Sequence, residues 1–245
     1  MKILVTGAAG EVAPGVVRAL ARHYQLRLLD LSRGDELSAA EWVIGSILDT
    51  DLLARALEGV EAVVHLAIAK ESAGRKPDTE EFFDVNVKGL YLLLAAAQAG
   101  GARCFVHIGS TAPVIGHWYE GRNITVNSPY TTRGRYSLTK ALQELVCEHF
   151  ARNTELRVVV LRPWSPCDAS GGTVPAEYSP GLIDGEDVGE ACRLAIEATE
   201  LGDFEVFHIV ATAEARKRFD ADRTEKLLGF RAKLDFGDLA AGAGE

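Results

Sequence analysis

Short apolar runs alternate with amphipathic segments along almost the whole chain. The runs lie at residues 2–6, 25–30, 41–45, 61–67, 103–110, 156–163 and 204–210. Most of them lack the polar alternation of a strand with one wet face, which is typical of strands covered by helices on both sides. Helical spacing is found at 12–22, 50–58, 79–99, 136–152 and 186–199, with Thr50, Asp78 and Asp184 as expected caps. This order predicts a doubly wound α/β fold with a parallel sheet.

Composition and charge limit the partners of the chain. Its 245 residues, 47% of them hydrophobic, are enough for one domain with a sizeable core. The formal net charge of −9 argues against nucleic acid or an anionic membrane as a partner, since both are polyanions. The first apolar run is too short for a signal peptide or a membrane span. The four cysteines, Cys104, Cys147, Cys167 and Cys192, are widely spaced, as expected of reduced, buried thiols in a cytoplasmic protein.

A glycine turn follows the first predicted strand. In TGAAGEVA, Gly7, Gly10 and Ala13 are spaced three residues apart and open the first predicted helix. Gly7 permits the tight turn, Gly10 lets backbone N–H groups approach a pyrophosphate, and Ala13 allows close packing of the helix. Because a helix N-terminus attracts phosphate, Gly10, Glu11 and Val12 are expected to contact a nucleotide, with the Glu11 side chain pointing outward.

An acidic residue ends the second predicted strand. Asp30 stands where a carboxylate accepts hydrogen bonds from the adenosine ribose hydroxyls and repels a 2′-phosphate. The alternative is an ordinary turn or cap residue. Its place after the glycine turn favours the first interpretation and NAD over NADP, although Arg33 lies close by.

Tyr136 and Lys140 lie four residues apart in a segment with helical spacing, so they share one helix face. Free tyrosine has a pKa of about 10, so it acts as a base near neutral pH only after a fall of about three, or about 4 kcal/mol. An ammonium about 5 Å away supplies about 3 kcal/mol at an effective dielectric constant of about 20, and oxidised nicotinamide can supply the rest. The pair is either an ordinary surface pair or the acid/base of an enzyme.

Two hydroxyl residues, Ser110 and Thr111, end the fifth predicted strand. A hydroxyl at the carboxyl edge of a sheet can hold a substrate oxygen while a tyrosine removes its proton. A Ser/Thr pair also satisfies many turns, so the two interpretations stand side by side.

Together these segments resemble the extended short-chain dehydrogenase/reductases, the NAD-dependent epimerase/dehydratase family, over nearly the whole chain. The matching segments are TGAAGEVA (6–13), LLD (28–30), GSILD (45–49), HLA (65–67), DVNVKG (84–89), GSTAPVIG (109–116), YSLTK (136–140) with Glu144, LRP (161–163) and TEKLLGFRAK (224–233). The resemblance implies a Rossmann-type doubly wound sheet in a single NAD(P)-binding domain over 1–245. A small C-terminal substrate lobe is expected from about 164–184 and 212–245.

The resemblance also implies roles for individual residues. Tyr136 is the expected acid/base, Lys140 lowers its pKa and holds the nicotinamide ribose, and Thr111 polarises the substrate. Ser110 and Ala112 lie beside Thr111. The remaining expected cofactor contacts are Asn86, which organises the site, Ser46 and Ile47 beside adenine, Leu66, Ala67 and Ile68 along the cleft, and Pro163. Ser46, Ala13 and Glu11 depart from the Asp, Gly and apolar residue that are usual in the family.

The stretch after Pro163 is short and resembles uronate dehydrogenase, which oxidises a free sugar acid. Arg216 or Arg218 would then pair with a carboxylate, or would form a solvated basic face. Aromatic residues in the two irregular stretches, His117, Trp118, Tyr119 and Trp164, suit a sugar face or cap the core. The other histidines lack metal-ligand spacing, so no metal site is expected: His65, His107 and His208 lie in predicted strands, and His23 and His149 are peripheral.

We therefore expect an NAD-dependent oxidoreductase acting on a hydroxyl of a sugar or sugar acid, with Tyr136 removing the proton while hydride leaves the same carbon. The runner-up is a nucleotide-sugar epimerase or dehydratase, which returns the hydride. A non-catalytic, NAD(P)-sensing Rossmann protein is the alternative from another class. Apolar surface on the helices at 79–99 and 136–152 predicts a homodimer with a four-helix interface.

Overall fold

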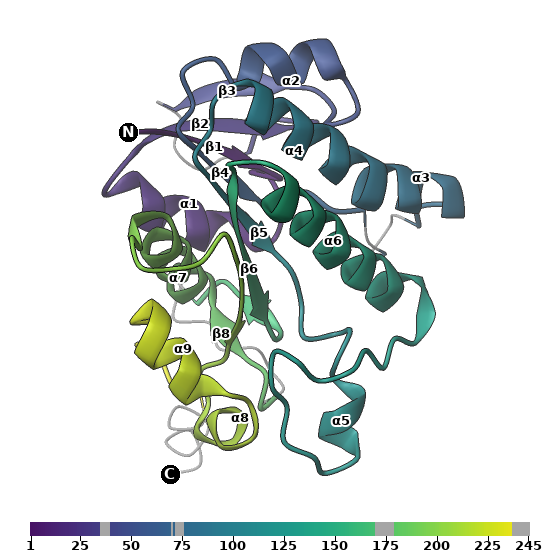
Figure 1. Ribbon diagram of the computed structural model, residues 1–245, viewed down its shortest axis with the longest axis vertical. Coiled ribbons are helices and arrows are strands. Elements are labelled where there is room, and N and C mark those ends of the chain that lie inside the picture. The colour runs from purple at the N-terminus through teal and green to yellow at the C-terminus, as the bar shows by residue number, and fades with distance from the viewer. Residues whose placement is uncertain (35–39, 70, 72–75, 170–178, 237–245) are drawn as a thin grey trace.

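The protein is built on one sheet of seven parallel strands, as Figure 1 shows. The computed structural model describes the chain except residues 35–39, 70, 72–75, 170–178 and 237–245. The strands are β1 (Lys2–Thr6), β2 (Gln25–Asp30), β3 (Glu41–Ile44), β4 (Ala62–His65), β5 (Cys104–Ile108), β6 (Arg157–Pro163) and β9 (Phe204–Ile209). Their order in the sheet is β3-β2-β1-β4-β5-β6-β9. Each predicted apolar run is a strand, so the doubly wound, Rossmann-type fold is confirmed.

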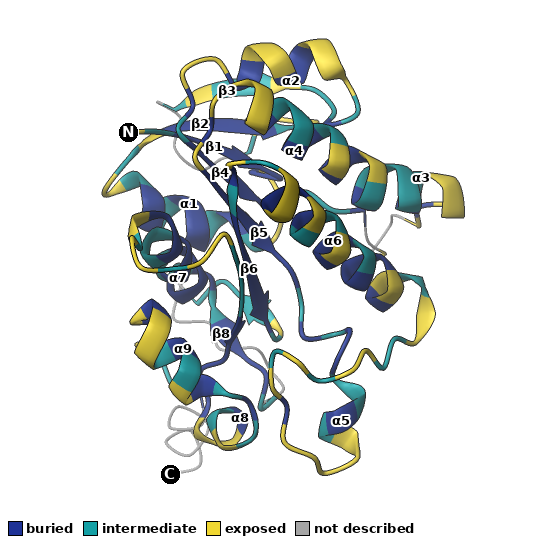
Figure 2. Cartoon of the chain, in the orientation of Figure 1, coloured by how far each residue is buried: buried dark blue, intermediate teal, exposed yellow. Residues whose placement is uncertain are grey.

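Helices cover both faces of this sheet. Helices α1 (Ala13–Ala21) and α7 (Gly185–Glu197) lie on one face, while α2 (Thr50–Ala56), α4 (Leu90–Ala99) and α6 (Gly134–Asn153) lie on the other. The core accordingly has two layers, one on each side of the strands. Figure 2 shows the central strands buried along their length, which explains why their sequences carry no polar alternation.

Small residues hold α1 tightly against α7. A Cβ added to Gly15 would lie 2.6 Å from the carbonyl carbon of Gly185, and one on Gly189 would lie 2.6 Å from the Cβ of Ala19. Real side chains do not tolerate such distances, so the two backbones can approach this closely only with glycine. The packing fixes the direction of α1, which begins directly after the glycine turn.

The segment predicted as one helix at 79–99 has three parts. An α-helical turn, α3 (Thr79–Phe83), leads into the π-helical segment η1 (Asp84–Gly89), and α4 follows. The carbonyl oxygen of Asn86 in this segment accepts a hydrogen bond of 2.8 Å from Nε2 of Gln143 on α6. The prediction of a helical segment is therefore confirmed, but its middle part is π-helical, and π-helical turns often mark functional sites.

Two of the three predicted helix caps differ in detail. Asp49, rather than Thr50, caps α2 by accepting a hydrogen bond from the Leu52 backbone N–H at 3.0 Å. Asp78 caps α3 as predicted. Asp184 precedes α7, but its carboxylate accepts a hydrogen bond from the backbone N–H of Ala169 instead.

Several short elements were not predicted. They are α5 (Gly116–Tyr119), the two-stranded sheet of β7 (Pro166–Cys167) and β8 (Ile183–Asp184), α8 (Ala213–Arg218) and α9 (Ala221–Leu228). Helices α5, α8 and α9 lie beyond the sheet, on the side of the carboxyl end of β6 (Figure 1). The predicted lobe at 164–184 and 212–245 includes 170–178 and 237–245, which lie outside the described residues.

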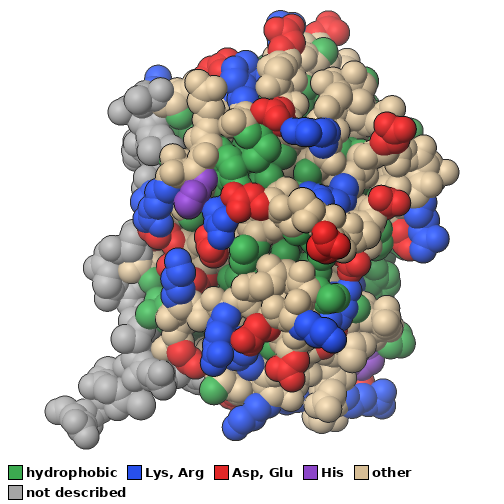
Figure 3. Space-filling view, turned by 60° about the vertical axis from the view of Figure 1, so that its left-hand side comes forward, with side chains coloured by type: hydrophobic (Ala, Val, Ile, Leu, Met, Phe, Trp, Pro, Cys, Tyr) green, Lys and Arg blue, Asp and Glu red, His purple; other side chains and the backbone are tan. Residues whose placement is uncertain are grey.

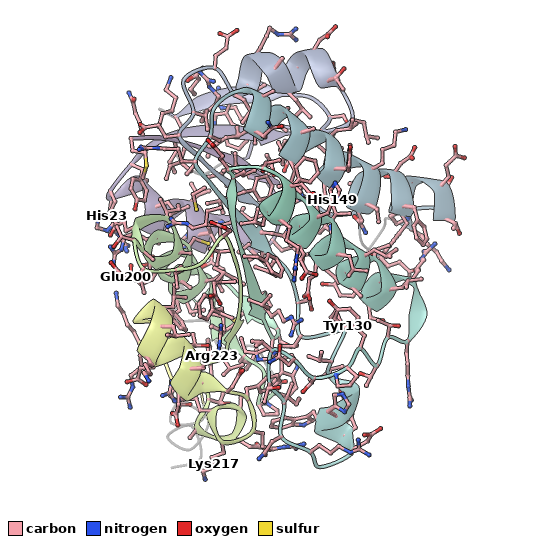
Figure 4. All side chains as sticks on the ribbon, in the orientation of Figure 1. His23, Tyr130, His149, Glu200, Lys217 and Arg223 are labelled. Atoms are coloured by element: carbon pink, nitrogen blue, oxygen red, sulfur yellow. The ribbon has the colours of Figure 1, made fainter. Side chains whose placement is uncertain are left out.

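Burial of the titratable side chains mostly follows the predictions. His65, His107 and His208 are buried, while His23 and His149, both labelled in Figure 4, are exposed. All four cysteines are free thiols, but Cys167 is only partly buried because β7 lies near the surface. Acidic and basic side chains are intermixed over the face in Figure 3. No helix in the described part of the chain is long and apolar enough to cross a membrane.

Candidate functional site

A cavity of about 810 Å³ opens at the carboxyl ends of the central strands. Parallel strands gather their carboxyl ends at one edge, so residues far apart in the sequence meet there. The predicted site residues in its lining are Gly7, Gly10, Glu11, Val12, Asp30, Ser46, Ile47, Leu66, Ala67, Ile68, Ser110, Thr111, Ala112, Tyr136, Lys140, Pro163 and Trp164. The structure thus brings together the predicted cofactor and substrate residues, with the exceptions of Asn86 and Arg216.

The glycine turn forms one end of the cavity. Gly7 has a φ of 74°, and a Cβ there would lie 2.4 Å from the backbone nitrogen of Ala67. Helix α1 then begins without a side chain capping its N-terminus. A helix end of this kind, bordering a cavity, fits a pyrophosphate through its backbone N–H groups and its dipole. Glu11 is exposed at the rim of this end.

Asp30 joins the glycine turn to the end of β2. Its Oδ2 accepts a hydrogen bond from the Ala9 N–H at 2.9 Å, and its Oδ1 accepts one from the Leu31 N–H at 2.6 Å. Each carboxylate oxygen has a second lone pair, so the group remains able to accept hydrogen bonds from ribose hydroxyls. The bond to Ala9 was not predicted, because an alanine in a glycine-rich turn carries no side-chain signal.

The pair Tyr136 and Lys140 lies in the first two turns of α6. The Lys140 side chain is buried, and its Nζ donates a hydrogen bond of 2.8 Å to the carbonyl oxygen of Ile108, the last residue of β5. Tyr136 is 37% exposed, whereas Thr111 is 1% exposed. The ammonium group is therefore held at the strand end that leads directly into Ser110 and Thr111.

Asn86 lies behind the cavity rather than in its lining. Its Oδ1 accepts a hydrogen bond from the Ala69 N–H at 2.7 Å, and its Nδ2 donates to the Ala69 carbonyl at 3.0 Å and to Thr139 Oγ1 at 3.3 Å. The side chain is fully buried. Asn86 thus fastens the segment after β4 to α6, which is an organising contact without direct access to the cavity.

Two histidines lie beneath the ammonium group of Lys140. His65 and His107 are fully buried neighbours on β4 and β5, with ring centroids 5.4 Å apart. Burial, and then the charge of Lys140, lower the pKa of His65 to about 3. Burial, and then the charge of Lys140, also hold the pKa of His107 well below its usual value. Both rings are therefore neutral at physiological pH, and Lys140 carries the positive charge of this region.

The structure does not bring Arg216 or Arg218 to this cavity. Arg216 pairs with Glu225 at 2.9 Å and lines a separate cavity beside α8 and α9. Arg218 donates to the carbonyl oxygens of His117 and Trp118, and its guanidinium lies 4.0 Å from the centroid of the Trp118 ring. The predicted substrate residue Arg216 therefore lies outside this cavity, because it is directed to Glu225 on α9, while Arg218 is directed to the backbone of α5.

Two of the four predicted aromatic residues border the cavity. Tyr119 and Trp164 are in its lining, whereas Trp118 packs against Trp164 with ring centroids 4.6 Å apart. His117 is turned away, with Nε2 2.9 Å from the carbonyl oxygen of Pro129. Lining residues that had no predicted role include Ala9, Ser32, Glu81, Ile115 and Ser165. Of these, Ile115 lies in the APVIG run and was the one with a recognisable signal.

These features define a Rossmann-type dinucleotide-binding protein: a glycine turn after β1, an acid at the end of β2 and a Tyr/Lys pair on α6. The chain belongs to the NAD-dependent epimerase/dehydratase family, whose model matches residues 3–177. The family depends on NAD, and the uncapped helix end, Asp30 and Lys140 fit the phosphates and the two riboses of that cofactor. Within the described residues, no group of three or more His, Cys, Asp or Glu side chains is placed to hold a metal ion.

Individual relatives cover several activities. Sterol demethylase protein B of Methylococcus capsulatus is 33% identical over 195 residues, covering 75% of this chain and 58% of that protein. The dTDP-glucose 4,6-dehydratase of Mycobacterium tuberculosis is 28% identical over 173 residues, covering 65% of this chain and 52% of that protein. The chain thus spans little more than half the length of these two relatives. The uronate dehydrogenase of Agrobacterium tumefaciens has a similar fold, with a TM-score of 0.85, 22% identity, and coverage of 98% and 87% of the two chains.

Proposed function

We propose that this protein is an NAD-dependent oxidoreductase that acts on a hydroxyl group of a sugar or sugar acid. The observation that carries the proposal is a single cavity lined by the glycine turn, Asp30, Lys140, Tyr136 and Thr111. Membership of a family that depends on NAD supports it. The likeness in fold to uronate dehydrogenase supports the sugar assignment.

The residues around the reacting hydroxyl have distinct tasks. NAD, when bound, accepts a hydride from the carbon that carries the hydroxyl. Tyr136, partly exposed at the cavity wall, takes the hydroxyl proton, and Lys140 stabilises the tyrosinate with its positive charge. Thr111 holds the substrate oxygen with its side-chain hydroxyl, and Ser110 supports the same turn by accepting a hydrogen bond from the Ala112 N–H at 3.1 Å.

The lining of the cavity as a whole favours a second candidate substrate, an alcohol with a large apolar face. Ile115, Trp164 and Pro166 contribute apolar surface there, and Lys140 is the one cationic side chain among the lining residues that the structure describes. Such a lining offers a sugar acid little charge complementarity. Sterol demethylase protein B, at 33% identity, supports this second candidate.

The same oxidation can be the first half of an internal cycle. In an epimerase or a dehydratase the hydride returns to the substrate, so NAD is regenerated within one turnover. The name of the family and the likeness to a dTDP-glucose 4,6-dehydratase support this form of the reaction. In either form, Tyr136, Lys140 and Thr111 have the same roles in the first step.

We also propose that the segments at 164–184 and 212–245 form the substrate lobe.

We propose further that the protein is a homodimer. Three large apolar side chains are exposed on neighbouring helices: Tyr91 on α4 is 49% exposed, and Leu138 and Leu145 on α6 are 42% and 52% exposed. Large apolar side chains on adjacent helices of one face are suited to burial against a second copy. Sedimentation velocity of the wild type and of Leu145→Glu tests this proposal, with a monomeric wild type contradicting it.

The activity is tested by incubating the protein with NAD and a panel of sugars, sugar acids and sterols. Net NADH identifies a dehydrogenase, and altered substrate without net NADH identifies an epimerase or dehydratase. Tyr136→Phe should abolish either activity, while Tyr91→Phe makes the same chemical change outside the cavity and should leave it intact. NAD binding without turnover of any compound would favour a sensor, and full activity of Tyr136→Phe would refute the mechanism.

A further inference from the structure

A buried ion pair lies behind the reactive end of the cavity. Arg162 on β6 donates from Nε to Glu144 Oε1 at 2.8 Å and from Nη2 to Glu144 Oε2 at 2.6 Å. Both side chains are 2% exposed. The hydroxyl of Tyr130 donates to Glu144 Oε2 at 2.9 Å. The carboxylate is thus bound on both oxygens, in the paired geometry that fixes direction as well as distance.

The pair continues into the C-terminal part of the chain. Nη1 of Arg162 lies 3.3 Å from Nε2 of His208 on β9, and Nδ1 of His208 lies 2.6 Å from Oδ1 of Asp220, the residue before α9. Burial lowers the pKa of His208, so its ring is neutral and carries one N–H. With that hydrogen on Nδ1, His208 donates to Asp220 and accepts from Arg162, which satisfies both partners. Asp220 Oδ2 also accepts a hydrogen bond from the Val126 N–H at 3.0 Å.

The Glu144–Arg162 part of this network lies next to the segments that carry the reactive side chains. Glu144 follows Lys140 by one turn of α6, and its Oε1 would lie 3.6 Å from a Cβ built on Gly109, the residue before Ser110. Arg162 precedes Pro163, whose carbonyl oxygen accepts a hydrogen bond from the Thr111 N–H at 3.3 Å. The network therefore lies directly behind α6, the end of β5 and the end of β6.

A network of this kind has one low-energy arrangement. Arg162, Glu144 and His208 are out of contact with water, so displacing one of them leaves a buried polar group without a partner, which costs more than the same loss at the surface. A shift of α9 therefore moves Asp220, His208 and Arg162 together rather than one at a time.

We propose that Glu144, Arg162 and His208 are positioning residues, which couple the seating of α9 to the placement of Lys140 and Tyr136 at the nicotinamide end of the cavity. This inference rests on the proposed function only for the statement that the nicotinamide lies beside Lys140. The network acts through the side chains that it holds and does not itself touch the cofactor.

The test compares the binding of NADH with that of ADP-ribose, which lacks the nicotinamide, by titration calorimetry at a temperature well below unfolding. His208→Gln keeps an acceptor for Arg162 but loses the N–H that Asp220 accepts. His208→Asn keeps an N–H for Asp220 but loses the acceptor for Arg162. Both should reduce the preference for NADH over ADP-ribose about fivefold, which corresponds to about 1 kcal/mol, the value of one hydrogen bond. Asp220→Asn, at the more exposed end of the network, is the mildest variant and should act in the same direction.

A matched control removes a buried arginine contact far from α9. Arg27 on β2 donates from Nη1 to the carbonyl oxygens of Ala56 at 2.7 Å and Glu58 at 3.0 Å, and β2 is separated from β9 by four strands of the sheet. Arg27→Gln should lower the melting temperature yet leave the preference within twofold of the wild type. If the His208 and Asp220 variants also keep the wild-type preference, the network only stabilises the fold and the proposal is overturned. A wild type without preference for NADH overturns the proposed function itself, and the coupling with it.

Discussion

Acidification should destabilise the fold through His65, and the size of the effect follows from its burial. The ring is fully buried, and its pKa falls from 6.5 to about 3 in the folded protein. The unfolded chain takes up a proton below about pH 6.5, while the folded chain keeps this ring neutral until about pH 3. The stability that this site contributes is thus fully present above pH 6.5 and is lost as the pH falls toward 3. Between about pH 7 and about pH 5, one such site removes about 2 kcal/mol from the free energy of unfolding.

The loss is measured by urea unfolding at both pH values, followed by tryptophan fluorescence. In His65→Asn the side chain cannot titrate, and its amide can still meet Thr6 Oγ1, which lies 2.7 Å from His65 Nδ1. The variant should therefore lose about 2 kcal/mol less than the wild type over this pH interval. Contributions from carboxylates and His208 are common to both proteins, and burial, the main cause of the low pKa of His107, is also kept in the variant. His23→Asn, at an exposed position, should lose as much as the wild type. If His65→Asn also loses as much, His65 is not neutral in the folded protein and the reasoning is refuted.

Three further substitutions test the cavity. Gly7→Ala should lower the stability by roughly 1 to 3 kcal/mol, since φ is 74° there and the new Cβ would meet the Ala67 backbone; an unchanged melting temperature would contradict this. Asp30→Asn should weaken NAD binding about tenfold and reduce the discrimination against NADP, measured by calorimetry with both cofactors. Unaltered affinities would mean that Asp30 only holds the glycine turn. Lys140→Met should reduce turnover about 100-fold or more, because the buried ammonium is lost, while AMP binding persists; undiminished turnover would remove Lys140 from the mechanism.

Much of the fold could be predicted from the sequence because most of its strands and helices have a recognisable local residue pattern. The apolar runs that became β1 and β5 have no wet face, and only a strand covered on both sides tolerates that pattern. Parallel strands direct their carboxyl ends to one edge, so Gly7, Asp30 and Thr111 could be placed in one cavity before any contact was known.

The remaining features depend on packing between distant segments. The π-helical segment η1 has an apolar pattern that an α-helix would also show, and the hydrogen bond from Gln143 to the Asn86 carbonyl comes from α6, 57 positions away. The contact of Arg162 with His208 could not be predicted from the strand pattern, because the two residues are 46 positions apart. Arg216 was expected at the substrate for its charge, but its direction depends on how α8 packs against α9.

The central claim is that Tyr136 and Lys140 remove a hydroxyl proton beside bound NAD. The most direct measurement is a single-turnover experiment, in which excess wild-type protein with NAD is mixed with a substrate found in the panel. Absorbance of reduced nicotinamide should rise on the enzyme whether the net reaction is dehydrogenation, epimerisation or dehydration, since all three begin with the same hydride transfer. With Tyr136→Phe the rise should be absent or slower by about 100-fold or more. A rise of undiminished rate in that variant, or substrate conversion at undiminished rate by wild-type protein freed of NAD, would contradict the account.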